Sequence, residues 1–152
     1  MAVNLAELIH EGGVFKDVEG SSPEEIYKKI TGMMSLPVGL SAEVVCNALC
    51  DREKIMSTAV GNGIALPHAR IPLLKNESDQ RICVVYLKNP IDMNAPDERK
   101  VFVMFVILTA NQHTHLQVLS TLVQLFQKKE FKKLPEQNAS EAELLNAIRN
   151  LS

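Results

Sequence analysis

The sequence predicts an α/β fold, a single layered domain over residues 1–152 with a mixed β-sheet flanked by helices on both faces. Two nearly continuous apolar runs, 81–87 and 101–109, are rich in β-branched and aromatic residues, as is typical of strands covered on both faces. Other segments carry apolar residues at helical spacing. With 46% apolar residues among 152, the chain can fill one such core.

Two helices are predicted ahead of the first apolar run. Ser22 precedes Pro23 and two glutamates, which suit an N-cap, a first-turn proline and the positive end of a helix dipole. A helix should therefore span residues 23–34. Ser41 can cap a second helix over residues 42–51. Its expected core face consists of Val44, Val45, Ala48 and Leu49.

The helical period stops between residues 57 and 70, where Gly61 and Gly63 permit backbone angles that other residues resist. The period returns from about Thr114, and Ser140 with Glu143 forms a capping box ahead of a last helix. The expected apolar stripe of the helix after Thr114 consists of Leu116, Leu119, Leu122, Val123 and Phe126.

Composition excludes several classes of function. A formal charge of −2 lacks the cationic excess that binding to nucleic acid needs, so no nucleic acid is expected as a partner. The longest apolar stretch, 101–110, is shorter than the roughly 20 residues of a membrane span. Residues 1–11 lack a signal-peptide pattern, so we expect a cytoplasmic protein without direct membrane insertion. The three cysteines are interpreted as core thiols: Cys46, Cys50 and Cys83.

The four histidines are candidates for chemistry because imidazole is a nucleophile and changes charge near neutral pH. His10 is expected at the surface. His68 follows Pro67 at the end of a short strand-like run, where it can be held rigidly at the mouth of a sheet. His113 and His115 would share a face on a strand but diverge on a helix. With His68 they could complete a zinc site, although no further ligand stands at recognisable spacing.

Residues 52–70 also combine groups that bind anions. A guanidinium has donors matched to phosphate oxygens, and hydroxyls and glycine-loop amides add neutral donors. The spacing does not match a nucleotide-binding P-loop, which needs glycine followed by Lys and then Ser or Thr. The candidate anion-binding residues are Arg52, Ser57, Thr58, Gly61, Gly63 and Arg70.

Two separate segments resemble the signature of one family. Residues 52–70 read REKIMSTAVGNGIALPHAR, and residues 107–116 read ILTANQHTHL ahead of a leucine-rich segment. Both resemble the fructose/mannitol/nitrogen-type enzyme IIA domains of the bacterial phosphoenolpyruvate:sugar phosphotransferase system. The two segments stand in the family's order, and the resemblance covers essentially the whole chain.

The resemblance implies a phosphoryl carrier without a metal or other cofactor. By resemblance, His68 accepts the phosphoryl group from a histidine phosphocarrier protein similar to HPr. His115 matches a second histidine that hydrogen-bonds near the transferred group, and Arg52 matches an arginine that faces the phosphoryl oxygens. His113 stands where the family pattern is not fixed. In transport members, the group passes onward to a cysteine of a IIB domain.

Two alternatives remain open in the sequence. One is a nitrogen-type regulatory module that binds other proteins and performs little or no onward transfer. The other is a small zinc hydrolase, which rests only on the number of histidines. The sequence names no sugar, downstream partner or oligomeric state.

Overall fold

Five strands form a mixed sheet in the order β1-β4-β5-β3-β2 in the computed structural model, which describes residues 4–151. β1 pairs with β4 in parallel, β4 with β5 antiparallel, and β5 with β3 in parallel. The predicted fold class is therefore confirmed. The strands are β1 (Val14–Val18), β2 (Ala59–Gly61), β3 (Ile64–Ala65), β4 (Arg81–Ile91) and β5 (Val101–Leu108).

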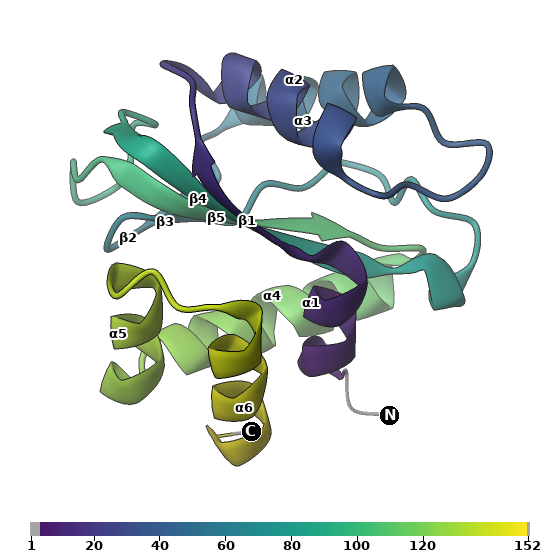
Figure 1. Cartoon of the computed structure of the whole chain (residues 1–152). Helices are drawn as coiled ribbons and strands as arrows, with labels where there is room; N and C mark the ends of the chain where they lie inside the picture. Colours follow the sequence, from purple (N-terminus) through teal and green to yellow (C-terminus); the bar gives the residue numbers. More distant parts are fainter. Residues whose placement is uncertain (1–3, 152) are drawn as a thin grey trace.

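Helices cover the sheet in two unequal layers (Figure 1). One layer consists of α2 (Pro23–Met33) and α3 (Ala42–Ile55). A short 3₁₀ turn, η1 (Glu77–Asp79), precedes β4. The other layer consists of α1 (Leu5–Gly12), α4 (Gln112–Phe126), α5 (Lys129–Glu136) and α6 (Glu141–Leu151).

Each face of the sheet has its own apolar core, which explains the continuous apolar sequence of the central strands. Along β4, Ile82 and Val84 pack into the core beneath the four-helix layer, whereas Cys83 and Val85 pack beneath α2 and α3. Successive side chains of a strand point to opposite faces, so a strand buried on both sides has no polar alternation. Of the three cysteines, Cys83 is buried, while the other two are half-buried against the core.

The predicted helix starts are confirmed by their caps. The Ser22 hydroxyl accepts from the Glu25 amide at 3.2 Å, and the Ser41 hydroxyl accepts from the Val44 amide at 3.2 Å. Ahead of α6, the Ser140 hydroxyl accepts from the Glu143 amide, and the Glu143 carboxylate accepts from the Ser140 amide. Each of these bonds satisfies an amide that the helix itself leaves unpaired.

The predicted end of the second helix is wrong. α3 continues past Asp51 to Ile55, so Arg52 and Glu53 lie in its last turn rather than after it. No glycine or proline interrupts this stretch, and Arg52 and Lys54 are cations at the negative end of the helix dipole. The extension matters because it places Arg52 on a rigid element.

Two of the predicted apolar faces are only partly correct. On α3, Val45 and Leu49 are buried, but Val44 is 50% exposed. On α4, Leu122 and Phe126 are buried together with Val118 and Leu125, which the predicted stripe omitted. Leu116 and Val123 are instead exposed. Apolar residues occur on both sides of this helix, so the period alone does not identify the buried side.

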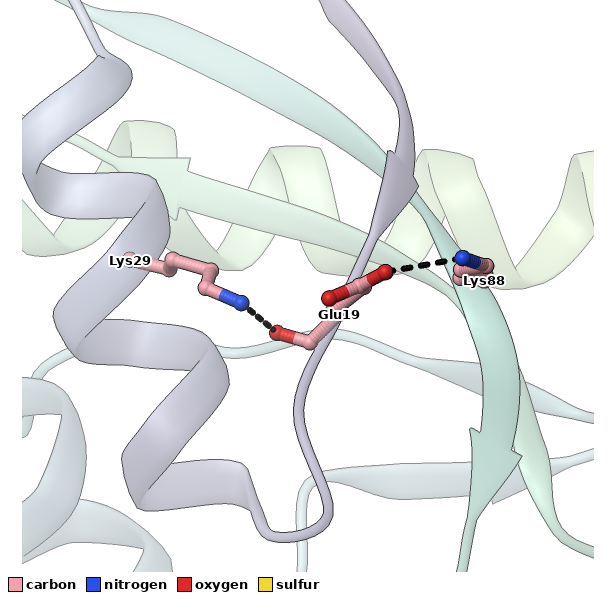
Figure 2. A network of polar contacts seen from close by, with 3 residues as sticks. All are labelled: Glu19, Lys29 and Lys88. Atoms are coloured by element: carbon pink, nitrogen blue, oxygen red, sulfur yellow. Dashed lines mark hydrogen bonds and ion pairs between the residues drawn. The ribbon is translucent and has the colours of Figure 1, made fainter.

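Glu19, in the loop after β1, joins α2 to the sheet (Figure 2). Its backbone carbonyl accepts from Lys29 of α2 at 2.7 Å, and its carboxylate accepts from Lys88 of β4 at 2.8 Å. The Glu19–Lys88 ion pair is exposed to water, and such pairs contribute little to the free energy of folding. The two contacts orient α2 rather than stabilise the whole fold.

Across residues 4–151, none of the helices has the length and apolar content that crossing a membrane requires.

Candidate functional site

His68 lies where β3 and β5 end beside each other. A bridge between His68 and Ile107 extends their parallel pairing, and the Ile107 amide donates to the Pro67 carbonyl at 2.8 Å. The carboxyl ends of parallel neighbours meet at one edge of a sheet, and α4 begins just after β5 at that edge. The half-buried His68 is thus fixed by sheet hydrogen bonds, between the two helical layers.

One ring nitrogen of His68 is bound within the protein. Nδ1 lies 2.8 Å from the carbonyl oxygen of Leu66. A carbonyl oxygen only accepts, so Nδ1 carries the proton in the neutral ring and Nε2 holds the lone pair. Nε2 is therefore the nucleophilic nitrogen of His68.

His115 lies against His68 from the first turn of α4. The two ring centroids are 4.6 Å apart, and the planes are inclined by 51°. Asn111 caps this helix, because its side chain accepts from the Thr114 amide at 2.8 Å. His115 is 9% exposed, whereas His113 is exposed. The two histidines are thus separated in the way expected for a pair on a helix.

Both histidines of the pair are held neutral. Burial lowers the pKa of His115 to about 4, and the positive charges of His68 and Arg52 act in the same direction. Burial also lowers the pKa of His68, although the Leu66 carbonyl opposes the shift; Arg52 lowers this pKa further. At neutral pH, the site therefore contains two uncharged imidazoles.

Arg52 supplies the permanent positive charge of the site. It projects from the last turn of α3, and its Nη1 donates to the Met56 carbonyl at 2.6 Å. Its charge lowers the pKa of both histidines, so it lies within electrostatic reach of them. The remaining guanidinium donors are suited to an anion placed beside the rings.

The hydroxyl candidates are engaged within the loop that leads into β2. The Ser57 hydroxyl donates to the Met93 carbonyl and accepts from the Ala59 amide at 3.1 Å. The Thr58 hydroxyl and amide both donate to the Glu53 carboxylate, at 2.7 and 2.8 Å. These contacts fix the loop rather than leave donors for an anion.

The remaining candidates lie outside the histidine pair. Gly61 and Gly63 have φ angles of 98° and 79° in the β2–β3 hairpin. A Cβ at Gly63 would lie 2.4 Å from the Phe102 ring, so this glycine is required by close packing. Arg70 is exposed. The structure thus brings together His68, His115 and Arg52.

Tyr27 and Glu53 are neighbours of this site that lie outside the predicted candidates. The Tyr27 hydroxyl donates to the Glu53 carboxylate at 2.6 Å. The two residues are 26 positions apart, and only the packing of α2 against α3 brings them together. The acidic residue next to Arg52 in the sequence was the one available signal.

The hollow at the histidine pair is small. Its volume is about 10 Å³, and its walls include His68, Ile71, Gln112 and His115. Sites that enclose small molecules usually measure about 300–1,000 Å³. A wider hollow of about 550 Å³, lined by Met56 and Ser57 among others, does not include either histidine. The shape of the histidine site suits a group presented by another protein.

No three His, Cys, Asp or Glu side chains within residues 4–151 are grouped to hold a metal ion. His113, the third member of the hypothetical zinc site, is exposed on α4 while His115 faces His68. The zinc interpretation therefore gains no support from the arrangement of these ligands.

Comparisons with known proteins show which proteins this chain is similar to. A nitrogen regulatory protein of Klebsiella oxytoca is 33% identical over 122 residues, which cover 78% of this chain and 74% of the relative. The mannitol-specific phosphotransferase enzyme IIA component of Staphylococcus aureus is 25% identical over 126 residues, or 83% of this chain and 84% of the relative.

Comparison with solved structures finds relatives of the same kind. The crystal structure of nitrogen regulatory protein IIA-Ntr from Neisseria meningitidis is 26% identical and gives a TM-score of 0.78, covering 93% of this chain and 96% of that one. A family model described as "Phosphoenolpyruvate-dependent sugar phosphotransferase system, EIIA 2" matches residues 7–151. The chain therefore belongs to the EIIA type 2 family of the phosphoenolpyruvate-dependent sugar phosphotransferase system.

Proposed function

We propose that this protein is a phosphohistidine carrier of the nitrogen-regulatory kind, with His68 as the phosphoryl acceptor. The observation that carries the proposal is the state of the His68 ring. Its Nδ1 is bound to the Leu66 carbonyl, and burial keeps the ring neutral. The lone pair of Nε2 is therefore available for nucleophilic attack.

The transfer is a direct exchange of one N–P bond for another. The lone pair of His68 Nε2 attacks the phosphorus of a phosphohistidine on the donor protein. The donor N–P bond breaks as the new one forms, and the donor nitrogen keeps the electron pair. The Leu66 carbonyl stabilises the positive charge that develops on the His68 ring, because it accepts from Nδ1.

Arg52 and His115 act on the charge of the transferred group. Phosphoryl transfer passes through a loose transition state in which negative charge spreads over three oxygens. The guanidinium of Arg52 neutralises part of that charge. His115 is uncharged at neutral pH and donates one hydrogen bond without repelling the ring of His68 as a second cation would.

The regulatory kind is favoured by the relatives. The nitrogen regulatory protein of Klebsiella oxytoca is 33% identical to this chain, against 25% for the mannitol component. The resemblance to this family implies an HPr-like protein as the donor, and a regulatory protein is the target suited to a relative of nitrogen regulatory proteins. We accordingly propose an HPr-like histidine phosphocarrier as the donor and a regulatory protein as the downstream target.

The test of the acceptor is phosphorylation with phosphoenolpyruvate, enzyme I and a histidine phosphocarrier. Intact-mass analysis should show one added phosphoryl group that is lost in acid and kept in base. His68→Ala should abolish the addition, while His113→Ala should retain it as the matched control. If His68→Ala is labelled as well as the wild type, His68 is not the acceptor.

A second experiment separates regulation from transport. The phosphorylated protein is mixed with mannitol-specific and fructose-specific IIB domains, and transfer to their cysteines is followed by mass. We expect phosphoryl transfer to these IIB domains to be slow or absent compared with transfer from a mannitol IIA control. Transfer as fast as that control would identify a transport component instead.

A further inference from the structure

The carboxylate of Glu53 has a neighbour in the sequence with which it does not pair. Arg52 precedes it directly in the last turn of α3, yet the ion pairs among residues 4–151 include none between the two. Glu53 instead accepts from three donors: the Tyr27 hydroxyl at 2.6 Å, the Thr58 amide at 2.8 Å and the Thr58 hydroxyl at 2.7 Å. The carboxylate is thus engaged by Tyr27 and Thr58 rather than by Arg52.

These bonds fix the segment that also holds Arg52. Thr58 lies two residues beyond Met56, and the Met56 carbonyl accepts from Arg52 Nη1 at 2.6 Å. Glu53 at one end and Thr58 at the other therefore determine where the Met56 carbonyl lies. The position of the guanidinium depends on the same short turn.

Tyr27 anchors the arrangement to the core. Its side chain is completely buried in α2, and only its hydroxyl reaches the polar cluster. Thr58 is 5% exposed. The Glu53 carboxylate itself is half-buried, and a hydrogen bond to a charged acceptor holds its partners more firmly than one between neutral groups.

We propose that Tyr27, Glu53 and Thr58 position Arg52 for phosphoryl transfer. They fix the turn after α3 and keep the Glu53 carboxylate from neutralising the guanidinium. This inference rests on the proposed carrier function of His68. None of the three touches the phosphoryl group; they are positioning residues that act through Arg52, and the charge of Glu53 also raises the pKa of His68.

The chain offers matched controls on the opposite face of the sheet. Tyr86 is also buried, and its hydroxyl donates to the Ala139 carbonyl at 2.9 Å. Glu143 also accepts from backbone and hydroxyl-bearing neighbours at the cap of α6, through the Ser140 amide at 3.1 Å. Tyr86→Phe therefore removes a comparable bond, and Glu143→Gln removes a comparable charge while its amide oxygen still accepts from the Ser140 amide; neither variant touches the site.

The experiment measures the rate of phosphoryl uptake from the donor, the KM for the donor, the thermal midpoint, and the Nε–H resonance of Arg52 in the unphosphorylated protein. We expect Tyr27→Phe and Glu53→Gln to lower the rate by about tenfold, since small displacements of catalytic groups have effects of this size or larger. The KM should not change, and the Arg52 resonance should shift. Tyr86→Phe and Glu143→Gln should change neither the rate nor the resonance.

Other results would contradict the positioning role of these residues. If Tyr27→Phe and Glu53→Gln keep the wild-type rate and Arg52 resonance, the positioning role is wrong. If Tyr27→Phe and Tyr86→Phe lower the rate only as far as they lower the thermal midpoint, the bond between Tyr27 and Glu53 has a structural role alone. That result also overturns the proposal. Should the wild type take up no phosphoryl group, the proposed function fails, and the Arg52 resonance alone decides the positioning role.

Discussion

The two helical layers contribute different kinds of group to the same edge of the sheet. The layer of α2 and α3 contributes Arg52 from the last turn of a helix, where the dipole favours a cation. The four-helix layer contributes His115 from the first turn of α4, where the dipole disfavours one. His68 lies between them on the sheet. One layer thus provides a fixed charge and the other a neutral hydrogen-bonding ring.

This difference shows how the fold meets two requirements at one site. An acceptor histidine must stay unprotonated, and a phosphoryl group must meet positive charge. The charge of Arg52 serves both, because it lowers the pKa of the histidines and attracts phosphoryl oxygens, whereas neutral histidines alone would lack permanent charge. With the two on opposite layers, each can be tested separately.

Removal of the fixed charge should have the largest effect. Arg52→Ala is expected to slow phosphoryl uptake by about 100-fold, the loss typical of removing one electrostatic stabiliser of a transition state. Arg52→Lys should recover part of the rate, because it keeps the charge but loses the planar fork. Rapid-quench measurements of His68 phosphorylation supply the numbers. Equal rates for wild type and Arg52→Ala would remove this layer from the mechanism.

Because the fold holds the His115 ring neutral, the stability of the protein should depend on pH. The pKa of His115 is about 4 in the folded protein and about 6.5 when unperturbed, so the folded state binds fewer protons between these values. The free energy of unfolding should therefore fall as the pH drops from about 6.5 to 4, by about 3 kcal/mol from this residue. Urea denaturation at pH 7 and pH 4.5 measures the loss.

His115→Gln provides the comparison for that loss. Glutamine does not titrate, so the variant should lose less stability than the wild type over the same pH interval. The other titrating groups are common to both proteins, so the difference reports on His115 together with its interaction with His68. Identical losses would mean that His115 is not held neutral by the fold.

Removal of the second ring should slow transfer less than removal of the charge. His115→Ala is expected to reduce phosphoryl uptake by about fivefold, because one neutral hydrogen bond contributes about 1 kcal/mol. The fold should persist, as judged by circular dichroism. Unchanged rates of uptake and of return to the donor would exclude His115 from the transfer.

The smallest effect concerns partner contact. Leu116 is 60% exposed beside His115, and Val123 is 42% exposed about two turns further along α4. Leu116→Ser should raise the KM for the phosphocarrier by a few-fold through loss of apolar contact area, whereas Val123→Ser should not. A similar KM for both variants would place the donor elsewhere.

Local sequence signals predicted much of the fold. Helix starts at Ser22, Ser41 and Ser140 follow from side chains that cap the next turn, and such bonds need no tertiary information. α1, β1 and α5 had no prediction. β1 is a short edge strand whose pairing with β4 spans about 70 residues, and α5 is lysine-rich with Pro135 inside it. Their stability comes from packing that a local pattern does not contain.

The candidate site residues that fall within a sequence motif could be predicted. His68, Arg52 and His115 were identified because they fall within two motifs of a known family. The bond from His68 to Leu66 and the bonds from Tyr27 and Thr58 to Glu53 were not identified. A backbone acceptor has no side-chain signature, and a contact across helices depends on how α2 and α3 pack.

The bond between His68 Nδ1 and the Leu66 carbonyl has a kinetic consequence for the proposed carrier. It leaves a single nitrogen through which the phosphoryl group both arrives and departs. Donor and recipient must then occupy the same approach to His68 in turn, and no complex containing both can transfer the group. Turnover should follow a ping-pong order, in which excess unphosphorylated donor competes with the recipient. The ratio of the two partners, rather than either concentration alone, would determine how long the phosphorylated state persists.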